Sequence, residues 1–131
     1  MEKKKRYRLV LLLLFAISIM LFGCGESGPD PNSVEDPTGS LDFSTIPDGT
    51  HRGTFTYGAF NYIVDVVAED GEVIDIIVIQ NKDNAPSIEA ESVLSRIVEA
   101  QSLEVDGISG ATVSSRSLMK AVENALKRAL N

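Results

Sequence analysis

A chain of 131 residues has room for one domain of ordinary size with a modest core. The chain carries 19 acidic and 12 basic residues, a formal net charge of −7. Five of the basic residues and one of the acidic residues fall within residues 1–23, so residues 24–131 carry a net charge of −11. This acidity disfavours nucleic acid as a partner and is typical of a surface that keeps a folded domain in solution. The single cysteine excludes a disulfide framework and a cysteine metal site.

The first 24 residues have the pattern of a secretion signal. A basic start, MEKKKRYR, precedes an apolar run from Leu9 to Phe22, and this run is short for a membrane span. Its end, LFGC, resembles the lipobox of bacterial lipoproteins, with Leu21 three residues before Cys24 and a small residue, Gly23, next to it. The resemblance implies cleavage before Cys24 and a lipid on its sulfur, which would anchor the protein at the extracytoplasmic face of the cell membrane. An uncleaved anchor and a buried helix are the alternatives.

A tether is predicted to follow the signal. Residues 25–47 contain four of the five prolines and few large apolar residues, a composition that favours a flexible spacer. The composition changes at Asp48. The sequence therefore predicts a signal peptide at residues 1–23, a lipidated cysteine and tether at residues 24–47, and a folded domain at residues 48–131.

The domain begins with three predicted antiparallel strands near Gly49–Tyr57, Asn61–Ala68 and Val73–Gln80, where β-branched and aromatic residues are frequent. The EDG sequence at Glu69–Gly71 predicts a tight hairpin between the second and third strands. The third strand, VIDIIVIQ, is apolar at nearly every position, which predicts that both of its faces are covered.

Two helices are predicted to pack on this sheet. Residues Ser87–Gln101 and Ser114–Leu130 both repeat apolar side chains at helical spacing, and Pro86 precedes the first of them. The order β-β-β-α-loop-α indicates a small α+β domain, in which an antiparallel sheet of three or more strands packs against two helices.

The loop between the two helices, VDGISGATVSS at Val105–Ser115, is rich in hydroxyl groups and small residues. It leads into a helix N-terminus, where unpaired backbone N–H groups and the helix dipole suit a phosphate. Gly107 and Gly110 would let the backbone come close to a ligand. The same composition is common in plain turns and helix caps, however, and the spacing alone does not choose between a phosphate site and a cap.

Other phosphate and nucleophile motifs fit the loop poorly. The chain has no GxxxxGK[ST] sequence, and Ala111 stands where a GxSxG nucleophile elbow needs its second glycine. His51, the only histidine, is predicted to be exposed at the start of a strand. These features disfavour a P-loop and a Ser-His-Asp hydrolase.

The sequence DGISGATVSS resembles the flavinylation motif of the FMN-binding domain family, in which Asp, two variable residues and Ser or Thr precede Gly, Ala and Thr. The matching residues are Asp106, Ser109, Gly110, Ala111 and Thr112. The resemblance extends over residues 47–130 and includes DGTHRGTF at the first strand. The family often has a His-x-Glu-Thr segment after the third strand, where this chain has NKDNAPS, so Asn81–Ser87 receive no role.

The resemblance implies that Thr112 carries FMN through a phosphoester bond. A separate flavin transferase, with FAD as donor and Mg²⁺, would install the cofactor, as it does in the flavin-bearing subunits of sodium-pumping NADH:quinone reductase and of the related ferredoxin-dependent complex. The protein would then be an electron-carrier domain rather than a stand-alone enzyme, and a membrane-bound donor would reduce it. No catalytic residue and no metal site is predicted within the chain.

Some details of the site are less specific. Tyr57, Phe60 and Tyr62 are candidates to face the flavin ring, although aromatic residues on strands are more often part of a core. Ser114 and Ser115 are predicted helix caps. Two alternative functions stay open: a module that binds FMN or another phosphate ligand noncovalently, and a structural lipoprotein in which the loop is only a cap.

Overall fold

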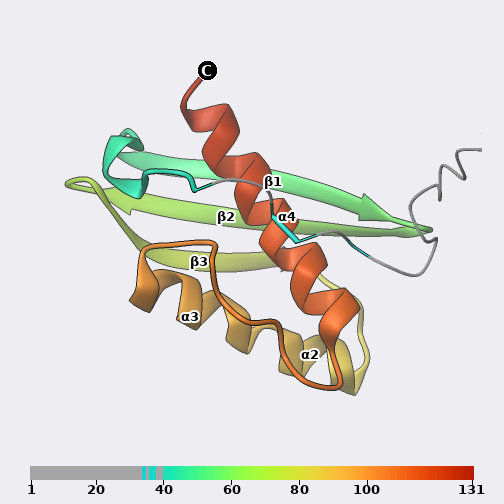
Figure 1. Ribbon diagram of the computed structural model, residues 1–131. Helices are drawn as coiled ribbons and strands as arrows, with labels where there is room; N and C mark the ends of the chain where they lie inside the picture. Colours follow the sequence, from blue (N-terminus) through green and yellow to red (C-terminus); the bar gives the residue numbers. More distant parts are fainter. Residues whose placement is uncertain (1–33, 35, 38–39) are drawn as a thin grey trace, which may run out of the picture. The chain divides into compact units, whose positions relative to one another are not determined.

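The computed structural model describes residue 34, residues 36–37 and residues 40–131. The predicted signal peptide, Cys24 and the first part of the predicted tether lie outside these residues. Within the described part of the chain, no helix is long and apolar enough to cross a membrane. A three-stranded antiparallel sheet is followed by helices α2, α3 and α4, which confirms the predicted α+β class (Figure 1).

The sheet consists of β1 (Gly49–Tyr57), β2 (Phe60–Glu69) and β3 (Glu72–Gln80), paired in chain order. All three strands lie within one residue of their predicted bounds. Asp70 and Gly71, which connect β2 to β3, have φ values of 53° and 79°. Two successive residues with positive φ are the mark of a type I′ turn, so the predicted tight hairpin is confirmed.

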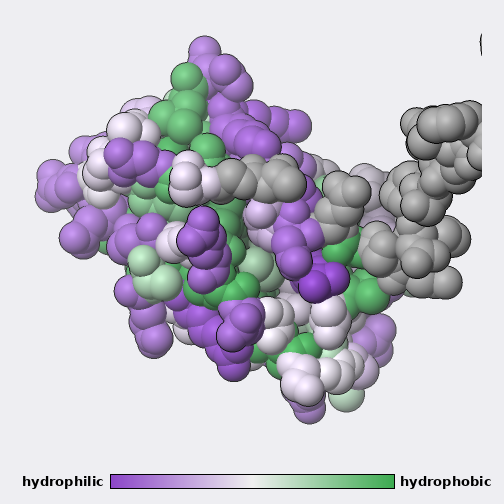
Figure 2. All heavy atoms as spheres, viewed as in Figure 1, coloured by the Kyte–Doolittle hydropathy of each residue, from purple (hydrophilic) through white to green (hydrophobic). Residues whose placement is uncertain are grey.

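Helix α4 (Thr112–Ala129) covers one face of the sheet. It packs against β1 and β2 and runs diagonally across them (Figure 1). The core between helix and sheet is made of alternate side chains of β2 and the apolar side chains of the helix, namely Tyr62, Val64, Val66, Ala68, Leu118, Met119, Val122 and Leu126. On this side the surface is mainly hydrophilic, with apolar side chains visible between the polar ones (Figure 2).

Strand β1 and helix α4 approach each other most closely at Gly53. A Cβ atom at this position would lie 1.8 Å from the carbonyl oxygen of Ala121 and 2.8 Å from the Cβ of Ala125. Beside this contact, the Asn124 amide donates a hydrogen bond to the carbonyl oxygen of Thr54 (2.9 Å). Small residues on both elements thus fix the position of α4 on the sheet, and with it the position of the helix N-terminus.

The single helix predicted over Ser87–Gln101 is wrong in one respect, because two helices occupy this region: α2 (Ala85–Ala90) and α3 (Ser92–Ala100). Around Glu91 the backbone makes 3₁₀-type bonds, from the Glu91 N–H to the Ile88 oxygen (3.2 Å) and from the Leu94 N–H to the Glu91 oxygen (3.0 Å). The break lets the two helices take different partners, since α2 packs against α4 and α3 against β3.

The prediction that both faces of β3 are covered is wrong for the described residues. Ile74, Ile77 and Ile79 are 49%, 46% and 46% exposed. The helices lie on one side of the sheet, so side chains of β3 that point to the other side have no described element over them (Figure 1).

Packing against the sheet begins before Asp48. Phe43 and Ile46, which lie within the predicted tether, are buried and join the core. Phe43 opens a short 3₁₀ helix, η1 (Phe43–Thr45), and the Asp42 carboxylate caps it by accepting the Ser44 N–H (3.0 Å). The last part of the predicted tether is therefore attached to the domain.

Candidate functional site

The hydroxyl-rich loop ends at the first residue of α4, which is Thr112. The N-cap residue is Ala111, whose side chain has no oxygen, and no side chain caps the start of this helix. The first turn also contains no acidic residue. The N–H groups of this turn and the positive end of the helix dipole are therefore available to an anion.

Gly110 sets the direction in which the chain enters the helix. Its φ is 80°, and the Ala111 N–H donates a hydrogen bond to the Ile108 oxygen (2.9 Å) across Ser109 and Gly110. A positive φ at the third position of such a turn is typical of type II turns, which favour glycine there. No atom lies within 4 Å of where a Gly110 Cβ would be, so the backbone conformation, rather than lack of space, explains this glycine.

Ser115 holds the loop against the first turn of the helix. Its hydroxyl accepts the Ile108 N–H (3.1 Å) and donates to the Thr112 carbonyl oxygen (3.1 Å). The loop passes so close that a Cβ at Gly107 would lie 3.0 Å from the Ser115 hydroxyl. The predicted capping role of Ser115 is wrong: this side chain braces the loop from within the helix and leaves the helix start uncapped.

Ser114 joins α4 to α2 and is not a helix cap either. Its buried hydroxyl lies 2.9 Å from the hydroxyl of Ser87 in α2.

The segment before α2 holds Ser87 in place. The Asn81 amide donates hydrogen bonds to the Ser87 carbonyl oxygen (2.7 Å) and to the Glu91 carboxylate (2.9 Å). The Asn84 side chain accepts the Ser87 N–H (3.0 Å). Asn81–Ser87, which receive no role in the sequence analysis, thus position α2 beside the N-terminus of α4.

A shallow hollow of about 400 Å³ surrounds this helix start. It is lined by Pro86, Gly110, Ala111, Thr112, Val113 and Ser114. The Thr112 side chain is exposed, whereas Ala111 is buried beneath it. Three of the five motif residues, Gly110, Ala111 and Thr112, therefore meet in one place.

The other two motif residues lie outside this lining. Ser109 is exposed in the turn before Gly110. Asp106 lines a second hollow together with Arg116, and its carbonyl oxygen accepts a hydrogen bond from Arg96 (3.2 Å). Arg116 forms an ion pair with Asp36 (2.7 Å). The structure does not bring the Asp106 side chain to the hollow around Thr112.

The three candidate aromatic residues differ in access. Tyr62 is fully buried in the core, and its hydroxyl has no hydrogen-bond partner among the described residues. Tyr57 is half-buried. Phe60 is 51% exposed, and the Lys82 ammonium lies 4.2 Å from the centre of its ring. Of the three, Phe60 is the ring with most surface to offer a planar ligand.

The features of this helix start fit the phosphate end of FMN: an exposed threonine, an uncapped first turn, a backbone direction set by Gly110, and no acidic residue in the first turn. The sequence model of the FMN-binding domain matches residues 57–127, which is more than half of the chain. The match runs from the last residue of β1 through most of α4 and includes the loop with Thr112. The chain therefore belongs to the FMN-binding domain family.

Proposed function

We propose that this protein is an electron-transfer flavoprotein that carries FMN on Thr112 through a phosphoester bond and is held by a lipid on Cys24 at the extracytoplasmic face of the cell membrane. The observation that carries the proposal is the exposed Thr112 hydroxyl at the first position of an uncapped helix, inside a matched FMN-binding domain. Lipid anchoring rests on the LFGC sequence alone.

Attachment would use FAD as the donor. The Thr112 oxygen would form a bond to the FMN phosphorus of FAD, the pyrophosphate bond would break, AMP would leave, and the hydroxyl would release its proton. None of the described side chains that line the hollow titrates near neutral pH. The base that activates the hydroxyl would therefore come from a flavin transferase, which would also supply the Mg²⁺.

Once attached, FMN would supply reversible electron uptake, and this chain would hold and orient it. Backbone N–H groups of Val113 and Ser114, in the first turn, would stabilise the phosphate charge. Phe60 would offer an exposed ring to the flavin. The protein would pass electrons from a membrane-bound donor to an acceptor outside the membrane.

Replacing Thr112 by Ala tests the covalent bond. The protein is produced in a host that contains a flavin transferase, and flavin fluorescence is recorded after denaturing electrophoresis. The wild type should keep its fluorescence and Thr112→Ala should lose it completely, while Thr50→Ala, which changes an exposed threonine on β1, should keep it. Flavin that leaves the wild type on denaturation would favour noncovalent binding, and a wild type without any flavin would contradict the proposal.

A further inference from the structure

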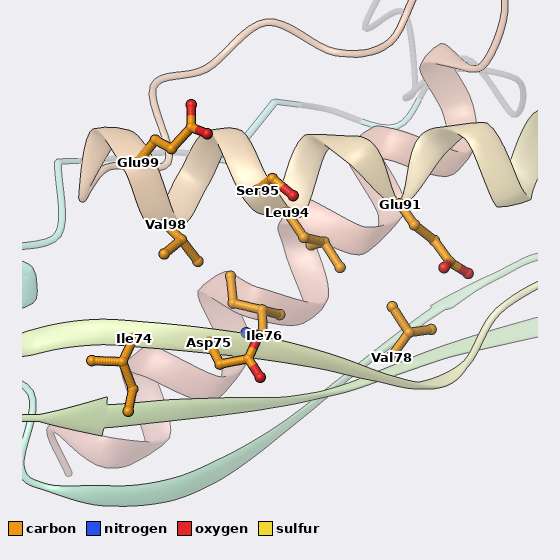
Figure 3. A pocket seen from close by; sticks show the side chains of 9 residues that line it. All are labelled: Ile74, Asp75, Ile76, Val78, Glu91, Leu94, Ser95, Val98 and Glu99. Atoms are coloured by element: carbon orange, nitrogen blue, oxygen red, sulfur yellow. Dashed lines mark hydrogen bonds between the residues drawn. The ribbon is translucent and has the colours of Figure 1, made fainter.

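A groove runs between β3, an edge strand of the sheet, and α3 (Figure 3). Its volume is about 520 Å³, larger than that of the hollow beside Thr112. Leu94 and Val98 point from the helix toward the strand, and Ile76 and Val78 point from the strand toward the helix (Figure 3). These four side chains give the groove an apolar floor. Ile74 lies at one end of the lining, where its exposed side chain points away from α3 and belongs to the rim (Figure 3).

The charged residues around this floor are all acidic. Asp75 of β3, Glu91 just before α3 and Glu99 near the end of α3 are in the lining together with the apolar residues and Ser95, and no basic residue is among the lining. The Glu99 carboxylate points away from β3, so it stands at the outer side of the rim (Figure 3). A groove with an apolar floor and an acidic rim favours a partner surface that carries both apolar and basic side chains.

The backbone edge of β3 is already partly occupied. The Gln101 side-chain amide accepts the Val73 N–H (2.9 Å) and donates to the Val73 carbonyl oxygen (2.8 Å), as a neighbouring strand would. The Asp75 carboxylate accepts the Ile76 N–H (2.8 Å). These bonds block the extension of the sheet by a further strand at these positions. A ligand of the groove must therefore bind mainly through side chains.

We propose that this groove binds a segment of a partner protein that carries both apolar and basic side chains. Apolar side chains would lie between Leu94 and Ile76, and lysine or arginine would face Asp75, Glu91 and Glu99. A second copy of this chain fits less well, because a symmetric contact of groove with groove would set carboxylates against carboxylates.

One end of the groove is joined to the proposed flavin site by hydrogen bonds. Glu91 accepts from Asn81, Asn81 also donates to the Ser87 carbonyl oxygen, and the Ser87 hydroxyl lies against that of Ser114 in the first turn of α4. A partner that engages Glu91 would thus contact the same network that holds the turn carrying Thr112. Docking itself requires no flavin, so it would survive if flavin attachment failed.

Binding of a labelled synthetic peptide of alternating valine and lysine to the full-length protein in detergent tests the proposal by fluorescence anisotropy. The affinity should fall as salt is raised. Glu99→Lys and Ile74→Asn should each weaken binding about fivefold, as expected for the reversal of one rim charge or the loss of one apolar contact. Glu89→Lys and Ile88→Asn are matched controls, because both residues are exposed on α2 outside the groove, and they should leave the affinity unchanged.

The controls distinguish binding in the groove from nonspecific attraction of a basic peptide to an acidic protein, because Glu99→Lys and Glu89→Lys change the net charge equally. Equal weakening by these two variants would overturn the proposal, and so would equal affinity for a peptide with glutamate in place of lysine. Self-association of the protein that Ile74→Asn abolishes, without peptide binding, would assign the groove to a second copy and would also overturn it.

Discussion

At the scale of single residues, the four hydroxyls between Ser109 and Ser115 have different environments. Ser109 and Thr112 are exposed, whereas Ser114 and Ser115 are buried and bonded to other protein groups. Burial and existing hydrogen bonds make the last two poor acceptors for a cofactor. Ser109 and Thr112 are distinguished first by the resemblance to the flavinylation motif, which points to Thr112 as the proposed attachment residue. The structure adds a physical reason, because Thr112 is the first residue of an uncapped helix, where a phosphate is stabilised.

Gly53 is the residue on which the close contact of β1 with α4 depends most directly. Gly53→Ala should lower the free energy of unfolding by about 3 kcal/mol, because the added methyl group would overlap the backbone of Ala121 and force the helix away from the sheet. Urea unfolding measures the difference.

Gly58→Asn is a suitable control for this substitution. Gly58 has a positive φ of 60° but no atom within 4 Å of its Cβ position, and asparagine tolerates this backbone region. Gly58→Asn should lower the free energy of unfolding by less than about 1 kcal/mol. If Gly53→Ala lowered the free energy of unfolding no more than Gly58→Asn does, the contact between Gly53 and Ala121 would not be rigid.

At the scale of elements, α4 contains a buried carboxylate that the proposed function does not use. Glu123 is 1% exposed and accepts hydrogen bonds from Lys120 and Lys127 on the same helix. Burial by itself would raise the pKa of Glu123, but the hydrogen bonds and charges of the two lysines outweigh it and lower the pKa below its ordinary value. This cluster should stabilise α4 only while Glu123 is ionised.

The pH dependence of stability tests the role of Glu123. A carboxyl whose pKa is lowered by folding stabilises the protein above its unfolded pKa of about 4.3, and this stabilisation is lost as the pH falls through the lower folded pKa. Glu123→Gln should therefore be less stable than the wild type at pH 7, by about 1–3 kcal/mol, and the difference should shrink below about pH 4.

Unfolding free energies of both proteins between pH 7 and pH 3 check this expectation. The Asp65 carboxyl also has a lowered pKa, because Arg52 donates hydrogen bonds to it, but this pair is present in both proteins and cancels in the difference. Parallel curves over the whole range would show that Glu123 contributes nothing through its charge.

The contact of α2 with α4 depends on the hydroxyls of Ser87 and Ser114, which lie 2.9 Å apart in a buried position. Ser87→Ala and Ser114→Ala should each lower the free energy of unfolding by about 1–2 kcal/mol, because each leaves one buried hydroxyl without its partner. The double variant should lower it by less than the sum of the two single effects, since no unpaired hydroxyl is left at this contact. Thermal or urea unfolding of the four proteins measures the coupling, and strict additivity would exclude a significant bond.

At the scale of the whole molecule, the sequence predicts what depends on neighbours along the chain. The turn at Asp70 and Gly71, the three strands and the start of α4 within two residues follow from local composition and periodicity. The break at Glu91 does not, because apolar spacing continues through it and the break reflects packing on different partners.

Contacts between distant residues escape a single sequence for the same reason. Nothing near Gly53 indicates that Ala121 will lie against it, and nothing near Ser87 indicates Ser114. The apolar run of β3 predicts two covered faces, but Ile77 and Ile79 are exposed. Whether an element packs over the second face depends on the rest of the chain, which the strand's own sequence does not report.

Covalent attachment of FMN to Thr112 is tested most directly by a mass spectrum of the protein exported from a host that contains a flavin transferase. Trypsin should release a peptide from Ile97 to Arg116, which contains all four hydroxyls of the motif region. If Thr112 carries FMN, this peptide gains the mass of FMN less one water, and fragmentation locates the addition on Thr112. An unmodified peptide, or FMN located on another residue, would contradict it.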